Sequence, residues 1–385
     1  MFDGISSSKR RTGTTAPQIS LLATWPTRKA KEPVATESRK RRVRELLSII
    51  ESIRRMLTVA LLTIGVFAGA NAAEPREEMT FGSNPGNLRM FSYVSESVKP
   101  SAPLIVVLHG CKQKAGTFAR DAGFLALADS AELVLLMPEQ KGLPSYLYDF
   151  YVFSWVTAIF GANNQNACFN WFEPEDTKRD SGEALSIRQM IDAMVQRYSV
   201  DPKRVYIVGL SAGGAMAVVM LTAYPERFAG GAVVAGVPYG CADTVFKALQ
   251  CMNPGLDLTP NDWRARVRKT TGHEGPMPVP PISIWHGTSD TRVLPRNQQE
   301  LVDQWTALHG ISETFVRSER GGRVTRKSYP GDAVPRVESV SVEGHGHAFP
   351  IDETATCGQP GDFVVSAGVC AAREIAQFWG LIRRN

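Results

Sequence analysis

Gly209-Leu210-Ser211-Ala212-Gly213 lies between the apolar run 205–208 and residues 214–224, which are rich in Ala, Met and Val. The flanking patterns predict a buried strand before the pentapeptide and a helix after it. Glycines at both ends of a Gly-x-Ser-x-Gly turn let the backbone crowd together, so the serine hydroxyl stands exposed above the edge of a sheet. The stretch therefore predicts an α/β fold with Ser211 as a nucleophile, and a structural strand-to-helix turn is the alternative.

Strand and helix patterns alternate from about residue 88. The sequence predicts an edge strand at 88–94 and, at 104–108 and 133–137, strands that are buried on both faces of a parallel sheet. Further strands are predicted at 232–235, 282–285 and 339–342, and helices at 118–130, 182–198, 297–308 and 371–382. This alternation predicts one α/β domain over residues 80–385, with a mainly parallel central sheet and helices on both faces.

A nucleophilic serine needs a base, and the base needs a carboxylate that fixes its tautomer. In parallel α/β sheets such groups lie at the carboxyl ends of strands. Asp290 and His347 each follow a predicted strand, and the chain order Ser211, Asp290, His347 is that of the α/β-hydrolases. We predict these three as catalytic residues. A turn-forming role is the alternative for Asp290, and Asp303 and Asp332 are weaker candidates for the acid.

Two histidines compete for the role of base. His345 and His347 are two residues apart, so in an extended loop their side chains point to opposite sides and one alone can face Ser211. We assign the base to His347 and expect His345 to line the substrate pocket or to lie on the surface. For His286, near the end of a strand, we expect a structural hydrogen bond.

Acyl transfer from a serine also needs two hydrogen-bond donors for the oxyanion. The first predicted donor is the backbone N–H of Ala212, the residue after the nucleophile. The second is the backbone N–H of Cys111, because Leu108-His109-Gly110-Cys111 sits at the end of an early predicted strand. Any side chain can accompany a backbone donor, so residue 111 can also take part in a disulfide.

The six cysteines suit an exported, disulfide-containing protein. Pairs between Cys241 and Cys251 and between Cys357 and Cys370 would close short loops, which leaves Cys111 with Cys168; free buried thiols are the alternative. There is no Cys-x-x-Cys, and no histidine flanks a cysteine at zinc-site spacing. We therefore expect no metal and no cofactor.

The N-terminal arm is excluded from the predicted domain. Residues 1–55 hold 13 Lys and Arg against 5 Asp and Glu, so they contribute +8 to a net charge of +5 and the rest of the chain carries −3. The folded part thus offers no charge that suggests a nucleic-acid partner. The arm is either a disordered extension or a mis-assigned start of translation.

Residues 56–73 have the order of a secretory signal. Arg54 and Arg55 precede an apolar run, and small residues at 68–72 follow with an Ala-x-Ala-type cleavage site. The apolar run is short for a membrane span, so an anchor is the lesser alternative. We expect an extracellular or periplasmic protein with no stable membrane insertion after cleavage.

Seven ordered motifs resemble the polyhydroxybutyrate depolymerase family of esterases from about residue 80 to the C-terminus. They are VLHGC at 107–111, CFNWF at 168–172, GEALSIRQM at 182–190, GLSAGGAM at 209–216, PYGCA at 238–242, WHGT at 285–288 and GHA at 346–348. Their order, with the oxyanion segment before the serine, resembles the type 2 catalytic domains.

The resemblance implies an α/β-hydrolase fold and a serine esterase with the triad and the oxyanion residue Cys111 named above. It also supports the serial pairing of the cysteines. We expect Trp171 and the loop around Cys168 to wall the substrate cleft. The implied substrate is a polyester or a small ester, of the 3-hydroxybutyrate type.

Two further interpretations stay open. Residues 143–161 form an aromatic insertion, which is either a lid or docking surface or an extra element packed on the body. For the function, a feruloyl or acetylxylan esterase is the alternative, because related folds use the same triad on plant polysaccharide esters. A non-catalytic binding protein on the same fold is the remote alternative.

Overall fold

The computed structural model describes residues 51, 74–144, 161–271, 277–331, 335–355 and 357–383. The elements described below all belong to the unit Ala72–Asn385. The predictions for residues 1–50 and 56–73, for most of the insertion 143–161, and for Asp332 concern segments outside the described residues. No helix in the described ranges combines the length and apolarity needed to cross a bilayer.

A ten-stranded mixed sheet forms the centre of this unit, in the order β1-β2-β4-β3-β5-β6-β7-β10-β9-β8. The six inner strands pair in parallel, whereas β1, β2, β9 and β8 pair antiparallel with their neighbours. The prediction of a mainly parallel sheet is therefore correct for the six inner strands. The antiparallel outer strands make the whole sheet mixed. The strands are β1 Arg76–Glu78, β2 Arg89–Val94, β3 Leu104–Leu108, β4 Val134–Glu139, β5 Val205–Leu210, β6 Gly230–Val234, β7 Ile282–Gly287, β8 Arg317–Gly321, β9 Val324–Ser328 and β10 Val337–Val342.

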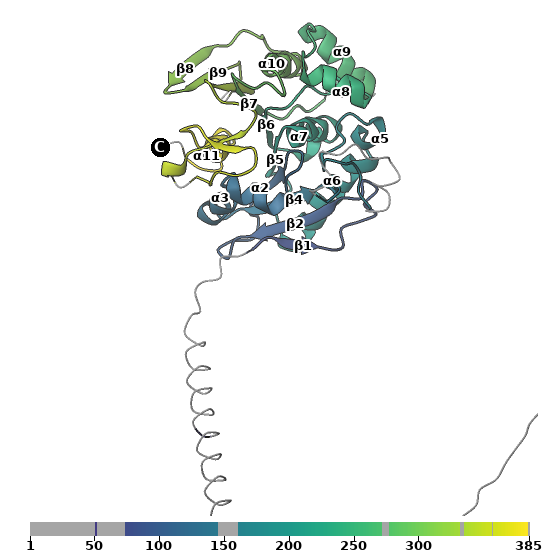
Figure 1. Ribbon diagram of the computed structural model, residues 1–385, viewed down its shortest axis with the longest axis vertical. Coiled ribbons are helices and arrows are strands. Elements are labelled where there is room, and N and C mark those ends of the chain that lie inside the picture. The colour runs from purple at the N-terminus through teal and green to yellow at the C-terminus, as the bar shows by residue number, and fades with distance from the viewer. Residues whose placement is uncertain are drawn as a thin grey trace, which may run out of the picture. The chain divides into compact units, whose positions relative to one another are not determined.

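Helices cover both faces of the sheet because the inner strands are apolar on both faces. In β3, Leu104 and Val106 pack into one core and Ile105 and Val107 into the other. Figure 1 shows α2, α3 and α11 on one side of the strands and α6 and α7 on the other. The helices are α2 Ala115–Asp121, α3 Phe124–Ala131, α5 Pro174–Thr177, α6 Gly182–Tyr198, α7 Ala212–Ala223, α8 Val245–Met252, α9 Pro260–Thr271, α10 Arg296–His309 and α11 Ala371–Phe378.

Two predicted elements differ from the structure. The strand predicted at an edge, β2, lies between β1 and β4, because the short polar strand β1 covers it. The single helix predicted over 118–130 is two helices, α2 and α3, since Gly123 adopts a left-handed conformation with a φ of 86° between them. The polar hairpin of β8 and β9 lacks the apolar alternation by which strands are recognised, and we did not predict it.

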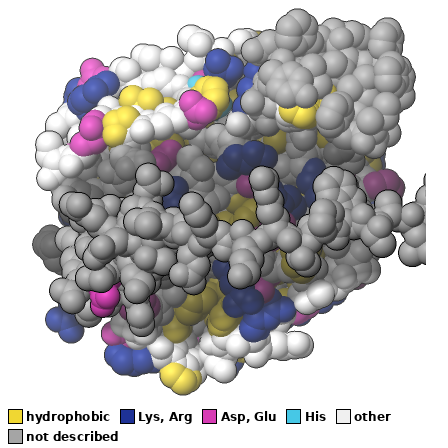
Figure 2. Space-filling view, turned by 60° about the horizontal axis from the view of Figure 1, so that its bottom comes forward, with side chains coloured by type: hydrophobic (Ala, Val, Ile, Leu, Met, Phe, Trp, Pro, Cys, Tyr) yellow, Lys and Arg dark blue, Asp and Glu magenta, His cyan; other side chains and the backbone are white. Residues whose placement is uncertain are grey.

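Acidic and basic side chains lie interspersed on the face of the unit that Figure 2 shows. Lys and Arg side chains alternate there with Asp, Glu and apolar side chains, so no large patch of one sign is visible among the described residues. This agrees with the small net charge of the chain beyond its N-terminal arm.

Candidate active site

The turn between β5 and α7 holds Ser211 in a strained conformation. Its φ of 57° and ψ of −119° are rare for a residue with a side chain. A Cβ at Gly209 would overlap the Gly213 carbonyl, and a Cβ at Gly213 would overlap the Leu108 carbonyl, so the turn admits only glycine at both positions. The Ser211 amide donates to the Val234 carbonyl at 2.9 Å, which fixes the turn against β6.

Ser211, His347 and Asp290 form a chain of hydrogen bonds. The His347 Nε2 lies 2.8 Å from the Ser211 Oγ, and the His347 Nδ1 lies 2.7 Å from the Asp290 Oδ2. An ionised carboxylate can only accept, so the His347 Nδ1 carries the proton and the Nε2 is free to take one from the hydroxyl. The structure therefore brings together the three residues predicted as nucleophile, base and acid.

Asp290 is held as a carboxylate. Burial opposes its charge, but hydrogen bonds from His286 and His347 outweigh burial and lower its pKa well below the ordinary value. Its second oxygen, Oδ1, accepts from the backbone amides of Arg292 and Val293 at 2.9 and 3.0 Å. A carboxylate with both oxygens occupied keeps a fixed orientation toward the imidazole.

His286 makes the structural hydrogen bond that we predicted, and it also lies beside Asp290. Its Nε2 donates to the Val293 carbonyl at 2.8 Å and lies 3.3 Å from the Asp290 Oδ2. Asp290 thus faces two imidazoles, and only His347 continues to the serine. Asp303, the weaker candidate for the acid, lies on α10 and accepts a hydrogen bond from Gln299.

His345 is buried, so the expectation that it lies on the surface was wrong, whereas its place in the lining of the substrate pocket stays a prediction. It is 3% exposed, its Nε2 lies 3.2 Å from the Ala348 carbonyl, and burial lowers its pKa. Its own carbonyl accepts from the Ser289 amide at 2.9 Å. The backbone of His345 therefore ties the loop that carries His347 to the loop that carries Asp290, and its side chain binds within its own loop.

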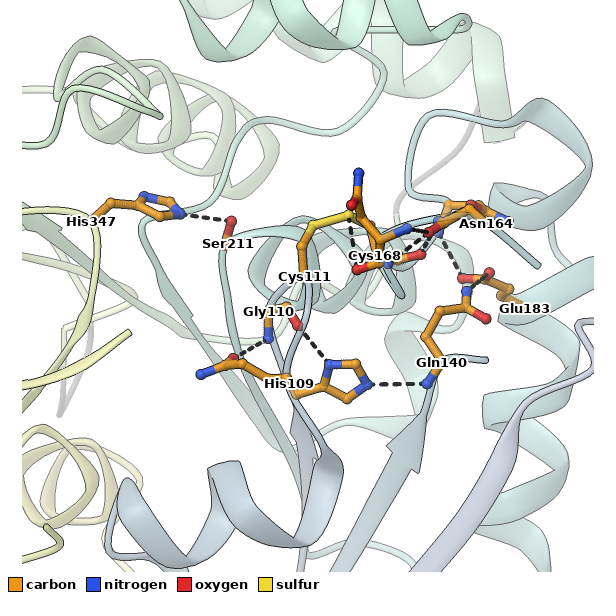
Figure 3. The surroundings of a disulfide bond; sticks show 12 residues. His109, Gly110, Cys111, Gln140, Asn164, Cys168, Glu183, Ser211 and His347 are labelled. Atoms are coloured by element: carbon orange, nitrogen blue, oxygen red, sulfur yellow. Dashed lines mark hydrogen bonds between the residues drawn. A yellow bond between two sulfur atoms is a disulfide. The ribbon is translucent and has the colours of Figure 1, made fainter. Parts of the chain in front are cut away.

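The two predicted oxyanion donors flank the serine. The Ala212 N–H lies in the first turn of α7, where helical amides have no partner within the helix. Cys111 lies beside Ser211 in Figure 3. Within the described residues we see no backbone acceptor for its amide. The Gly110 amide before it donates to the Gln113 Oε1 at 2.6 Å, which fixes the direction of the loop.

The Cys111–Cys168 disulfide ties this loop to the segment 164–170. Within that segment the Asn164 Oδ1 accepts from the Cys168 amide at 3.0 Å, and the Asn164 Nδ2 donates to the Cys168 carbonyl. The Lys112 amide donates to the Asn166 carbonyl at 2.7 Å. Backbone and covalent links thus hold Cys111 from the side opposite to the serine (Figure 3).

A buried polar network lies behind the disulfide. The His109 Nδ1 donates to the Gly110 carbonyl at 2.7 Å, and its Nε2 accepts from the Gln140 amide at 3.1 Å. The Gln140 side chain donates to the Glu183 Oε1, and the Asn170 amide donates to the Oε2 of the same carboxylate at 2.9 Å. Burial and the neighbouring charge of Asp176 raise the pKa of Glu183 well above its ordinary value.

We did not predict the roles of Gln140 and Glu183. One signal was available, because Glu183 occupies the apolar face of the predicted helix 182–198, where a carboxylate needs a partner. The partner lies on a different element and cannot be identified from the helix itself.

Trp171, predicted as a wall of the cleft, lines a groove of about 860 Å³. It is 9% exposed and packs edge-to-face with Phe172 at 5.3 Å between ring centroids. The groove is also lined by Tyr239, Gly240 and Cys241, which follow β6, and by residues of α8 and α9. The groove therefore connects the disulfide loop with the helices above β6.

The six cysteines form three disulfides, in the serial pairing that we expected. They are Cys111–Cys168, Cys241–Cys251 and Cys357–Cys370. No group of three or more His, Cys, Asp or Glu side chains in the described ranges is arranged to hold a metal ion.

Comparisons with known proteins show which family this chain resembles in sequence and which proteins share its fold. The family described as Esterase PHB depolymerase matches residues 94–329. Poly(3-hydroxyalkanoate) depolymerase C of Paucimonas lemoignei is 40% identical over 86% of this chain and 76% of its own length. Feruloyl esterase B of Neurospora crassa is 30% identical over 77% of this chain and 96% of its own length. An acetyl xylan esterase from Aspergillus awamori shares the fold, with a TM-score of 0.64 at 20% identity over 80% of this chain and all of that chain.

Proposed function

Because the chain belongs to the Esterase PHB depolymerase family of carboxylic ester hydrolases, we propose that it cleaves polyhydroxyalkanoate-type esters through an acyl-enzyme on Ser211. The observation that carries the proposal is the hydrogen-bonded chain from Ser211 through His347 to Asp290, at 2.8 and 2.7 Å. Substrates of the 3-hydroxybutyrate type are favoured by the 40% identity to a poly(3-hydroxyalkanoate) depolymerase.

The reaction proceeds in two acyl transfers. The Ser211 Oγ attacks the ester carbonyl while the His347 Nε2 takes its proton, and the amides of Cys111 and Ala212 stabilise the tetrahedral oxyanion. The imidazolium then protonates the departing alcohol, and a bond from the acyl carbon to Ser211 remains. Water repeats the sequence, releases the acid and restores the hydroxyl. Asp290 stabilises the imidazolium in both steps.

A panel of esters tests the substrate. We expect hydrolysis of 3-hydroxybutyrate dimers and trimers with a higher kcat/KM than that of methyl ferulate or acetylated xylan. Replacement of Ser211 by Ala should lower kcat by about 10⁵- to 10⁶-fold and abolish labelling by a fluorophosphonate probe. Labelling of the Ser211→Ala variant, or turnover close to that of the parent, would refute the mechanism.

A second candidate function is a feruloyl or acetylxylan esterase. It is favoured by the 30% identity to a feruloyl esterase along almost the whole length of that relative. The same ester panel decides between the two, because methyl ferulate and acetylated xylan would then be the better substrates.

Export of the protein is part of the proposal. Three disulfides in one domain are typical of proteins that fold in an oxidising compartment. We infer that residues 56–73 are removed as a signal and that residues 80–385 form the mature catalytic domain. N-terminal sequencing of the secreted protein tests this, and a mature product that retains residue 40 would contradict it.

A further inference from the structure

The turn at residues 361–364 places an aromatic ring beside the catalytic histidine. The backbones of Gly361 and Val364 exchange two hydrogen bonds of 3.0 Å, and Phe363 within the turn has a φ of 54°. A bulky residue is rare in this left-handed region, so the turn holds Phe363 in a strained conformation. The Phe363 ring packs edge to face on the His347 ring, with 6.1 Å between the ring centroids. The strained backbone therefore directs this ring at the catalytic base.

The same turn is linked to the loop that carries the predicted oxyanion donor. The buried side chain of Gln113 accepts a hydrogen bond from the Gly110 amide at 2.6 Å and donates one to the Asp362 carbonyl. Gly110 directly precedes Cys111, whose amide is that predicted donor. Phe363 therefore lies in a turn that contacts the catalytic histidine and is tied to the oxyanion loop.

Arg292 carries an exposed cation beside the same ring. It lies two residues after Asp290, whose Oδ1 accepts a hydrogen bond from the Arg292 backbone amide at 2.9 Å. The carbon of its guanidinium lies 5.1 Å from the centre of the Phe363 ring. In the part of the chain that the structure describes, we see no carboxylate paired with this guanidinium. The charge of Arg292 is therefore held close to the triad and is available to a ligand.

The reaction places the leaving alcohol on this side of the serine. The His347 Nε2 protonates the alcohol oxygen when the tetrahedral intermediate collapses, so this oxygen must lie within hydrogen-bond distance of the imidazole. The former carbonyl oxygen lies at the oxyanion donors at the same moment. The leaving half of the substrate therefore begins next to His347, the residue on which the Phe363 ring packs.

A short leaving alcohol is long enough to reach the guanidinium. The separations of 6.1 Å from the His347 ring to the Phe363 ring and of 5.1 Å from that ring to Arg292 set an upper limit on the distance to be spanned. One hydroxybutyrate unit adds four backbone bonds, which span about 5 Å when extended. This unit and a charge-assisted hydrogen bond of about 3 Å cover most of that limit.

We propose that Phe363 and Arg292 form the binding site of the leaving alcohol, in which Arg292 binds the carboxylate at the free end of a hydroxy-acid oligomer. This inference rests on the proposed function, because the alcohol that leaves from such an oligomer carries its carboxyl end. A guanidinium binds a carboxylate through two parallel charge-assisted hydrogen bonds. The Phe363 ring packs against the methyl-bearing carbons between the ester and the carboxylate.

The chemistry assigns this site to one step of the reaction. The acyl half of the oligomer stays on Ser211 and ends in a hydroxyl group, so it presents no anion to Arg292. The alcohol half has left before water attacks. Arg292 therefore acts during acylation and leaves the hydrolysis of the acyl-enzyme unchanged.

The test compares two 3-hydroxybutyrate dimers that differ only at the end of the leaving alcohol. One ends in a free carboxylate and the other in a carboxamide, so each contains a single ester bond. In Arg292→Gln, we expect kcat/KM for the carboxylate dimer to fall about 5- to 10-fold, because a partly exposed ion pair is lost. The kcat/KM for the carboxamide dimer should stay within about twofold of the parent. Arg292→Lys keeps the charge and should retain part of the preference for the carboxylate.

Arg296→Gln is the matched control, because Arg296 is a nearby exposed arginine that pairs with Asp257 at 3.1 Å. It should leave both dimers within about twofold of the parent, and a melting curve of each variant checks its folding. Equal losses on both dimers in Arg292→Gln would overturn the carboxylate site, since they would mean that Arg292 only holds the surrounding loops in place. An unaltered enzyme that hydrolyses acetylated xylan and neither dimer would instead refute the proposed polyester function.

Discussion

The groups on the two sides of Ser211 differ in kind, because one side presents side chains and the other presents a backbone amide. On one side His347 and Asp290 reach the hydroxyl through two direct hydrogen bonds, of 2.8 and 2.7 Å. On the other side the predicted oxyanion donor is the backbone amide of Cys111, whose position is set by a disulfide and by buried groups behind it. The function of the first side depends on which side chains are present. The function of the second side depends on where the Cys111 amide is held.

This difference has a chemical basis. A proton acceptor must be an imidazole in one tautomer, so its substitution removes the function outright. An oxyanion donor is an amide that every residue except proline possesses, so substitution can only displace it. We therefore expect large losses on the first side and graded losses on the second.

The largest effect in this comparison should come from Asp290→Asn. The asparagine side chain presents either an NH₂ donor or a neutral acceptor to the His347 Nδ1. The tautomer with a proton on Nδ1 and a free Nε2 is therefore less stabilised. We expect kcat to fall by about 10⁴-fold. Asp303→Asn is the matched control, since Asp303 was the competing candidate and lies on α10, and its kcat should stay within about threefold of the parent. A similar loss in both variants would contradict the assignment.

An intermediate effect is expected when the disulfide next to the oxyanion donor is removed. In Cys111→Ala/Cys168→Ala the amide remains but loses its tether, so we expect kcat to fall about 10- to 100-fold with little change in KM. The control is Cys241→Ala/Cys251→Ala, which leaves the tether of Cys111 intact. Both double variants should melt at lower temperature, and the first by more, because its disulfide closes the longer loop, with a sequence separation of 57 against 10.

If the control double variant loses as much kcat as the first, the disulfide acts through overall stability and the geometric argument fails. Steady-state kinetics well below both melting temperatures separates the two explanations.

A smaller effect should follow from Glu183→Gln. The carboxylate of Glu183 accepts from Gln140 and from the Asn170 amide, whereas a glutamine has one oxygen and must turn its NH₂ toward a donor. The segment that carries Cys168 then shifts, and we expect kcat to fall about tenfold with KM unchanged.

The readout that identifies a positioning role is the affinity for a tetrahedral transition-state analogue, which should fall in parallel with kcat. Glu175→Gln is the control, because Glu175 is exposed and its carboxylate binds Lys178 and the Ser181 hydroxyl at the surface. An analogue affinity that is unchanged in Glu183→Gln would show that the network does not position the oxyanion donor.

The sequence predicted the first side of the site better than the second. Ser211, Asp290 and His347 lie in the turn or loops that follow β5, β7 and β10, so the motif and the strand end are enough to place them. The inner strands β3 to β7 were also predicted, because strands that are buried on both faces have continuously apolar sequences.

The rest depends on contacts between distant segments. Gln140 and Glu183 meet through a fold that brings the end of β4 to the start of α6, and neither residue belongs to a motif with a known chemical role. The surface position predicted for His345 was wrong because the alternation of side chains in an extended loop predicts which histidine faces away from the serine. It does not predict which groups that histidine then contacts. The hairpin β8–β9 was missed because its five exposed residues in β8 lack an apolar face.

The smallest expected effect concerns stability and compares Asp290 with Asp303. The folded state lowers the pKa of Asp290, since hydrogen bonds from His286 and His347 outweigh burial. Burial and the neighbouring charge of Glu300 raise the pKa of Asp303. The ionised form is thus favoured on folding at Asp290 and disfavoured at Asp303.

The two aspartates should therefore give pH dependences of opposite sign. Asp290 contributes stability that is present above the unfolded pKa of about 3.9 and is lost as the pH falls toward its lower folded value. Asp303 contributes stability below about pH 3.9 that is lost as the pH rises toward its higher folded value. As the pH falls from about 6 to 3, the melting temperature of the parent should fall relative to that of Asp290→Asn and rise relative to that of Asp303→Asn. We expect each of these changes to be about 2 to 4 °C. Differential scanning calorimetry of the three proteins measures this, and slopes of the same sign would show that hydrogen bonding to His286 and His347 does not outweigh the burial of Asp290.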